Sequence, residues 1–508
     1  MPVRHSMLTR IPAAALGAIL ALGVSALMRW GSCGALAQTA TGGAPPAARR
    51  APLTLDARAR ARILDSLYAN VLREYVEADT ARLVVRAVQK RQQAGAYEAL
   101  TNPTEFAEKV TADLRSVNGD RHLSLRYDPE GAIPGGPGAP VIVSRRVPGP
   151  GGPAGPGAPG GPVVVIREGP GPGGRGGPGG PPDSALANLP GMRGALRQNF
   201  GLTKLEILSG NVGYLAVSGF MGAPGADDAI AIALRFLERT DAIIIDVRQN
   251  RGGSGMMSHY LFSHFLPATP VPTIRVKSRA SAEAEVNQSI AQVKGPRRTD
   301  VPLYVLTSRG TGSAAEEFSF VLKNLGRATL VGERTAGAGH MVRGFALPDG
   351  FQAGVSITRV SDPRTGREWE GVGVQPDIAV DADHALAVAH SAALRSLAGR
   401  PGAEGRRLEL EWTAEWVAAK DRGDAPDAGR AAALVGDFEA ERSVTLRGGR
   451  LYYRRGGFPA SELVPLDDGR FALDGETRIR FVDGTPSPSL TVERANGSSV
   501  AAARVVGR

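Results

Sequence analysis

Cysteine is almost absent from this chain of 508 residues, which contains a single one, Cys33. A lone cysteine excludes an intramolecular disulfide and a zinc site built from cysteine pairs. A catalytic nucleophile elsewhere in the chain must therefore be another residue type.

Lysine is also scarce, because only seven of the 60 basic residues are lysine. The arginines are scattered, and no run of five basic residues occurs. The formal net charge of +10 would suit a polyanion, but there is no basic cluster, zinc spacing or aromatic–basic alternation. We therefore predict no nucleic-acid partner.

Long apolar runs are missing except near the N-terminus, where residues 11–27 are apolar and follow the basic residues Arg4 and Arg10. The small residues Ala35 and Ala37 then flank Leu36. This pattern is typical of an export signal over residues 1–37, cleaved after Ala37, and predicts a periplasmic or extracellular protein. An uncleaved membrane anchor is the alternative, since the run is nearly long enough to span a bilayer.

The rest of the chain divides by composition. Residues 38–52 are predicted to be a flexible leader, and 53–130 a helical subdomain in which Asn102 starts a helix. Glycine and proline fill 33 of the 52 positions in 131–182, so 131–190 is predicted to be a disordered insertion. Strand and helix patterns alternate over 191–395, which predicts an α/β core with parallel strands. A helical connector (396–435) and a small all-β domain with glycine turns (436–508) follow.

Ser313 is the candidate nucleophile. It follows a strand and a glycine turn and opens a predicted helix, where the helix dipole and the Ala314 N–H could stabilise an oxyanion. The alternative is purely structural, because Ser313 and Glu316 also fit a capping box. A second glycine turn, Gly252-Gly253, ends a buried strand that carries Asp246. Glycine there would let a backbone approach a ligand closely.

These segments resemble the tail-specific, or C-terminal processing, serine peptidases. Four motifs occur in that family's order: Asp246-x-Arg248-x-Asn250-x-Gly252-Gly253, Thr311-Gly312-Ser313-Ala314-Ala315-Glu316, Gly332-Glu333-Arg334-Thr335-Ala336-Gly337 and Glu370-Gly371-Val372-Gly373-Val374-Gln375-Pro376-Asp377. Segments 199–201 and 210–215 resemble the branch named after interphotoreceptor retinoid-binding protein. The resemblance covers residues 55–395 without the insertion. It implies a crotonase/Clp-protease-like core, Ser313 as nucleophile, and Gly252 or Gly253 with Ala314 as the oxyanion hole.

The general base is less obvious. The lysine that many family members carry after the third motif is missing, and Lys323 lies ten residues beyond Ser313, roughly 15 Å along a helix. The tricorn-like branch uses a histidine from the N-terminal part and a glutamate after the serine motif. His122 and Glu370 match those positions, with Glu368 as the second choice for the acid.

The match to the tricorn-like tetrad has one departure. Arg121 stands where that branch has a serine before its histidine, and Ser124 lies close by in the sequence. His340 is the rival base, and both His340 and Ser124 are interpreted as lining the site. His259 and His264 lack a metal-binding frame, so we predict no metal and no cofactor.

The predicted function is that of an exported serine endopeptidase acting on unfolded or C-terminally exposed proteins and peptides. His122 would take the Ser313 proton, and Glu370 would orient it. The sequence is compatible with a homo-oligomer and does not predict the number of subunits. The main alternative is a non-catalytic protein that binds an apolar ligand or a peptide on the same scaffold. A crotonase-like enzyme acting on acyl thioesters is a weaker one, because no phosphate-cradling loop occurs.

Overall fold

The computed structural model describes residues 53–129, 192–279, 281, 283–482 and 489–505. The predicted signal, leader and glycine/proline insertion, and Cys33, lie outside the described residues. In the described chain, no helix has the length and apolar character needed to span a membrane.

A six-stranded sheet forms the centre of the core, in the order β11-β8-β7-β4-β3-β2. Neighbouring strands are parallel except β2 and β3, which are antiparallel. All five residues of β4 are buried, because helices cover both faces of the sheet. The predicted alternating α/β core is therefore present. Its strands are β2 (Leu202–Leu208), β3 (Val212–Val217), β4 (Ala242–Asp246), β7 (Leu303–Thr307), β8 (Thr329–Gly332) and β11 (Ile378–Ala379).

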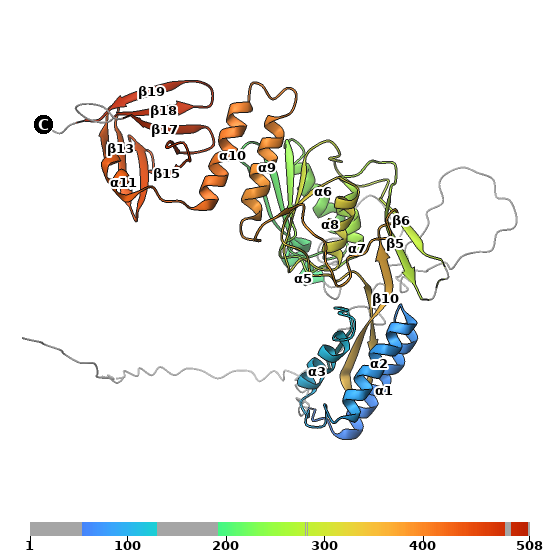
Figure 1. Ribbon diagram of the computed structural model, residues 1–508. Helices are drawn as coiled ribbons and strands as arrows, with labels where there is room; N and C mark the ends of the chain where they lie inside the picture. Colours follow the sequence, from blue (N-terminus) through green and yellow to red (C-terminus); the bar gives the residue numbers. More distant parts are fainter. Residues whose placement is uncertain (1–52, 130–191, 280, 282, 483–488, 506–508) are drawn as a thin grey trace, which may run out of the picture. The chain divides into compact units, whose positions relative to one another are not determined.

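Helices cover this sheet on opposite sides (Figure 1). One face carries α5 (Met192–Arg197), α6 (Ala226–Phe236), α7 (Gly255–Ser263) and α8 (Ala314–Asn324), and the other carries α9 (Ala385–Ala398) and α10 (Arg407–Arg422). The sequence placed α10 in a connector. In the structure its residues Leu410 and Ala414 are buried against the sheet, so this helix belongs to the core.

A second sheet carries the N-terminal helices. The helices are α1 (Ala57–Glu74), α2 (Ala78–Gln93) and α3 (Pro103–Arg115), and Asn102 caps α3 as predicted. They share a core with Phe351, Ala353 and Val355 of β10. The helical subdomain is thus completed by a strand from the far end of the peptidase-like region. The strands of this sheet are β1 (Ser124–Tyr127), β5 (Pro272–Ser278), β6 (Glu285–Gln288), β9 (Met341–Ala346) and β10 (Phe351–Ser361), and short 3-10 turns lie at Asn199–Gly201 and Pro348–Gly350.

The C-terminal part is an antiparallel meander of eight strands, preceded by α11 (Ala428–Leu434). An antiparallel bridge between Phe438 and Arg504 brings the end of the last strand back to the first, so the sheet is nearly a barrel. The all-β C-terminal domain is therefore confirmed. Its strands are β12 (Gly436–Phe438), β13 (Arg442–Arg447), β14 (Arg450–Arg455), β15 (Ser461–Pro465), β16 (Phe471–Ala472), β17 (Thr477–Val482), β18 (Ser489–Arg494) and β19 (Ser499–Ala503).

Candidate active site

Ser313 lies at the junction between the loop after β7 and helix α8, in an unusual backbone conformation with φ 52° and ψ −119°. A residue that only caps a helix normally has extended φ and ψ, and positive φ is uncommon outside glycine. Its N–H donates to Glu316 Oε2 at 2.9 Å, which is one half of a capping box. Capping therefore explains the position of the Glu316 side chain but not the positive φ of Ser313. A non-glycine residue with this backbone conformation is strained, and strained residues of this kind are found at functional turns.

The glycine turn after β4 packs directly against this serine. Gly252 and Gly253 have φ of 108° and 126°, and a Cβ on Gly252 would lie 2.7 Å from Ser313 Cβ and 3.1 Å from the Ala314 nitrogen. The Gly252 N–H donates to Asn250 Oδ1 at 2.8 Å. Of the predicted oxyanion donors, the Gly253 and Ala314 amides are those without a hydrogen bond in the described part of the chain.

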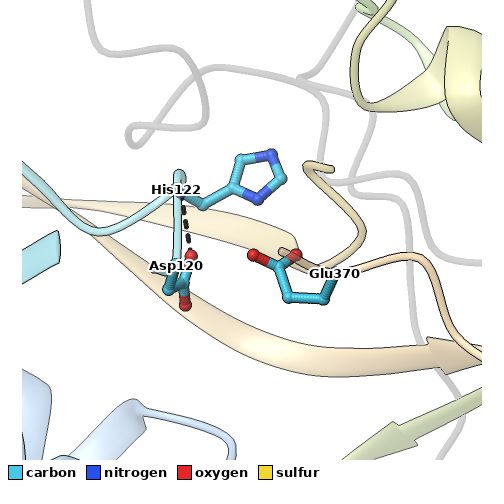
Figure 2. A group of neighbouring side chains, drawn as sticks. All are labelled: Asp120, His122 and Glu370. Atoms are coloured by element: carbon cyan, nitrogen blue, oxygen red, sulfur yellow. Dashed lines mark hydrogen bonds between the residues drawn. The ribbon is translucent and has the colours of Figure 1, made fainter. Parts of the chain in front are cut away.

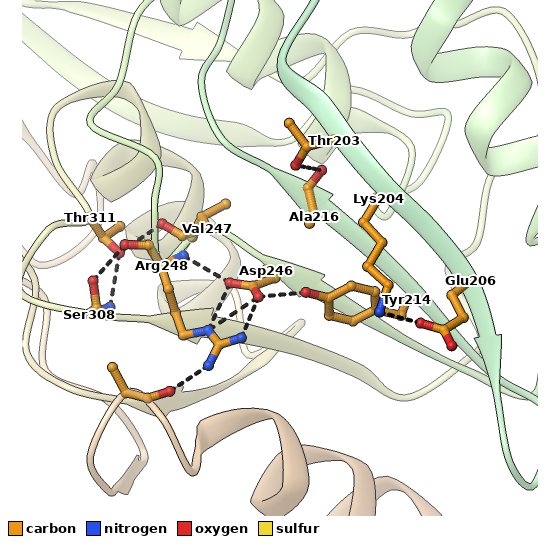
Figure 3. A network of polar contacts seen from close by, with 11 residues as sticks. Thr203, Lys204, Glu206, Tyr214, Ala216, Asp246, Val247, Arg248, Ser308 and Thr311 are labelled. Carbon is orange, nitrogen blue, oxygen red and sulfur yellow. Dashed lines mark hydrogen bonds and ion pairs between the residues drawn. The ribbon is translucent and has the colours of Figure 1, made fainter. Parts of the chain in front are cut away.

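Asp246 and Arg248, the residues of the Asp-x-Arg pattern before these glycines, stabilise the turn by hydrogen bonds and an ion pair (Figure 3). The Asp246 carboxylate accepts hydrogen bonds from Tyr214 Oη at 2.7 Å and from the Arg248 guanidinium at 2.7 Å. Burial alone would raise the pKa of Asp246, but these hydrogen bonds outweigh it and lower that pKa. Thr311 Oγ1 donates to the Val247 carbonyl at 2.9 Å. The braced turn is thereby tied to the loop that carries Ser313.

His122 lies in the loop between α3 and β1. The backbone N–H of His122 donates to Asp120 Oδ1 at 2.9 Å. Its Nδ1 is buried and has no hydrogen-bond partner among the described residues. Burial lowers the pKa of His122, so the ring is neutral at neutral pH and able to accept a proton.

Glu370 approaches His122 from the loop that follows β10 (Figure 2). An imidazole nitrogen of His122 and one carboxylate oxygen each of Asp120 and Glu370 lie within 4.8 Å of one another. Glu370 Oε1 is buried without a hydrogen bond in the described chain, and burial raises the pKa of Glu370. The other acidic candidate, Glu368, is instead paired with Arg359 at 2.6 Å.

His340 is held by both carboxylates of this cluster. Its Nδ1 lies 3.2 Å from Asp120 Oδ2 and 3.9 Å from Glu370 Oε2. Burial would lower the pKa of His340, but the hydrogen bond with Asp120 and the charge of Glu370 raise it. Burial would also raise the pKa of Asp120. Hydrogen bonds to its carboxylate, above all the one with His340, outweigh burial and lower the pKa of Asp120 to about 2. His340 is thus the more cationic of the two histidines.

A short loop, residues 337–340, connects the serine to this cluster through two glutamates. Glu316 accepts hydrogen bonds from the N–H groups of Gly337 and Ala338 at 2.6 and 2.7 Å. Glu370 accepts them from the next two, Gly339 and His340, at 2.6 and 2.8 Å. The capping-box pattern alone does not predict this second role of Glu316, although the run of small residues at 337–339 is a signal for a backbone that binds acceptors.

Asp120 is the other residue that sequence reasoning missed, although its position two residues before His122 was visible. It is 1% exposed and also accepts a hydrogen bond from Tyr75 Oη at 2.9 Å. Asp120, His122 and Glu370 are the one grouping in the described chain that could hold a metal ion. Because both Asp120 oxygens already accept hydrogen bonds, from Tyr75, His340 and the His122 N–H, we assign no metal there.

The remaining predicted residues make no hydrogen bond to the side chains of this cluster among the described residues. Ser124 is buried and faces Gly354 of β10, and in the described chain it makes no hydrogen bond to His122. Lys323 pairs with Asp377. His259 and His264 each bind a backbone carbonyl, of Gln288 at 2.7 Å and of Pro296 at 2.8 Å, which agrees with a packing role.

Comparison with known proteins gives a family match for one part of the chain. Residues 211–380 match the model of peptidase family S41, and all four motifs lie within this range. A carboxyl-terminal-processing protease of Synechocystis sp. is 33% identical over 174 residues, which are 34% of this chain and 38% of that protein. The carboxy-terminal processing protease CtpB of Bacillus subtilis is 28% identical over 172 residues, 34% of each chain. Less than half of either relative is therefore matched.

Among solved structures, the photosystem II D1 C-terminal processing protease is similar at 25% identity with a TM-score of 0.29, covering 34% of this chain and 42% of that chain. The resemblance inferred from the order of the motifs is thus confirmed by the sequence comparisons for the region that contains them.

Proposed function

Because residues 211–380 match the model of peptidase family S41, we propose that the whole chain is an exported serine endopeptidase that cleaves unfolded or C-terminally exposed proteins. One observation carries the assignment of its site. His122 and Glu370 are far apart in sequence, yet they meet with a buried nitrogen and a buried oxygen that no other described group satisfies. Unpaired buried polar atoms are uncommon in folded proteins, and a catalytic role is one physical reason for them.

In this proposal His122 accepts the proton of the Ser313 hydroxyl while the oxygen attacks the carbonyl carbon of the scissile peptide bond. The negative charge that develops on the carbonyl oxygen is stabilised by the N–H groups of Ala314 and Gly253. His122 then returns the proton to the leaving amine, and Glu370 stabilises the transient imidazolium. Water hydrolyses the acyl-enzyme by the same route in reverse.

Among the described residues no hydrogen bond joins Ser313 to His122. Catalytic hydrogen bonds are often long without substrate and shorten when it binds. The crotonase-like type of core and the location outside the cytoplasm belong to the same proposal. The first is supported by the order of the motifs, and the second by the N-terminal residue pattern.

The test is hydrolysis of an unfolded protein by the full chain, compared with Ser313→Ala and His122→Ala. We expect each substitution to lower kcat/KM by at least roughly a thousandfold, as in other sites of this kind. His384→Ala is the matched control, because His384 also pairs with a carboxylate, that of Asp421 at 2.9 Å, but lies on the surface.

Three other outcomes are informative. Loss of activity in Ser313→Ala alone would place the base elsewhere, with His340 next. Loss in His384→Ala as well would indicate a general effect on folding. A wild-type chain that cleaves none of several unfolded substrates would contradict the proposal and favour the binding-protein alternative.

A further inference from the structure

Among the described residues, strand β2 forms an unpaired edge of the central sheet. It is the last strand in the sheet order and pairs only with β3 in the described chain. A free edge presents a row of unpaired N–H and C=O groups, which is a template for pairing with another strand. Proteins usually shorten, bend or charge such an edge to block that pairing.

One face of β2 is apolar and exposed. The register with β3 places Leu205 opposite Leu215, which is buried on the α6 side of the sheet. Leu205 is nevertheless 37% exposed, and Ile207, on the same face, is 48% exposed. Two large aliphatic side chains on an open edge therefore remain in water in the single chain.

The other face of β2 carries two opposite charges, one on each side of Leu205. Lys204 Nζ lies 2.6 Å from Glu206 Oε2, and their side chains are 58% and 42% exposed (Figure 3). Leu205 is the middle residue of the strand, which runs from Leu202 to Leu208. The charges are therefore complementary to themselves under a twofold rotation about Leu205.

We propose that β2 is a homodimer interface in which two copies of this chain pair their β2 strands antiparallel, about a twofold axis at Leu205. Lys204 then lies opposite Glu206 of the second copy, and Glu206 opposite its Lys204. Leu205 meets Leu205. The register of β2 with β3 shifts between Leu202 and Lys204, so the regular pairing between the two copies is centred on Lys204–Glu206. The two central sheets join along these residues, and the same surface is used on both copies, as expected of an isologous interface.

Charge placed on an edge only to prevent pairing would repel a second copy. Here the pattern attracts one, because each strand offers both signs in mirrored positions. This argument uses no residue of the candidate active site, so it stands whether or not the chain is a peptidase.

The test is the dissociation constant of the full chain, measured by sedimentation velocity, beside Lys204→Glu, Glu206→Lys and the double exchange. We expect a wild-type dimer and a Kd raised roughly tenfold in each single variant, because like charges then face each other at two symmetry-related places. The double exchange should restore the wild-type Kd, because opposite charges face each other again. Lys90→Glu, on the exposed surface of α2, is the control and should leave the Kd unchanged.

Several results would overturn the proposal: a monomeric wild-type chain at all concentrations, single variants that dimerise as tightly as wild type, or a double exchange that fails to recover. Thermal unfolding of each variant separates a broken interface from a damaged fold. Hydrogen exchange of the β2 amides adds an independent readout, because their protection should rise with protein concentration. Protection that is already complete in a monomer would mean that another segment covers this edge.

Discussion

At the scale of single residues, the two histidines of the cluster differ in what surrounds them. Burial lowers the pKa of His122 below the ordinary 6.5, and the carboxylates of Asp120 and Glu370 raise that of His340 above it. A general base must be neutral to act, so its pKa sets the pH below which activity is lost. The pH dependence therefore distinguishes the two candidates.

If His122 is the base, the acidic limb of kcat/KM has its midpoint below pH 6.5, the unperturbed value. We expect His340→Gln to lower the rate while its midpoint stays below that value. The measurement is kcat/KM against pH for both proteins, from about pH 4 to 8, in the presence of a chelator. A wild-type midpoint above pH 6.5 would point to His340 instead.

At the scale of elements, the glycine turn after β4 and the start of α8 leave no room for a side chain between them. Gly252→Ala would force φ of 108° on alanine and place its Cβ 2.7 Å from Ser313 Cβ. We expect the free energy of unfolding to fall by about 1–3 kcal/mol and kcat/KM to fall by at least about a hundredfold, because Ser313 and the oxyanion donors must move. Chemical denaturation and peptide hydrolysis measure the two effects.

Gly326→Ala is the control for this substitution. Gly326 also has positive φ, 65°, but a Cβ there would meet nothing within 4 Å. It should lose some stability and keep its activity. Full activity in Gly252→Ala would show that the close contact with Ser313 is not needed.

At the scale of the whole molecule, helix α10 contacts both the core of the central sheet and the C-terminal near-barrel. Leu410 and Ala414 pack under the central sheet. On the other side of α10, the Arg478 guanidinium carbon lies 4.1 Å from the centroid of the Trp412 ring. Thr413 Oγ1 donates a hydrogen bond to the Gly475 carbonyl at 3.1 Å. The C-terminal near-barrel is therefore joined to the core by a shared helix.

Replacing Arg478 by alanine removes its contact with Trp412 and its ion pair with Glu415. We expect the near-barrel to lose about 1–2 kcal/mol of local stability, seen as faster hydrogen exchange over residues 436–503 with unchanged exchange in β4 and β7. Arg480→Ala is the matched control, because the Arg480 side chain is 52% exposed and pairs with Glu493 at the surface. Equal acceleration in the central sheet would show that the two parts unfold together.

Much of this organisation follows from local sequence patterns. Three kinds of element depend on residues close together in the sequence, through apolar periodicity, capping and turn chemistry. They are the buried strand Ala242–Asp246, the helix cap at Asn102 and the glycine turns of the C-terminal domain. The four motifs likewise depend on order along the chain, and they identified the peptidase-like region. Glu370 lies in the fourth of these motifs, whereas His122 is predicted from its match to the histidine of the tricorn-like branch.

Which distant segments share a sheet, and therefore what surrounds each candidate side chain, depends on the three-dimensional fold. Strand β10 lies more than two hundred residues after the N-terminal helices whose hydrophobic core it shares. It pairs with β1, the strand that follows the His122 loop in the sequence. That pairing is set by packing between remote segments, which no local pattern encodes. It brings Asp120 and His340, 220 positions apart, within 3.2 Å, and gives the two histidines their opposite shifts in pKa. Local sequence patterns thus specify the helices and strands and the reactive side chains that they carry, while long-range packing specifies which of these side chains meet.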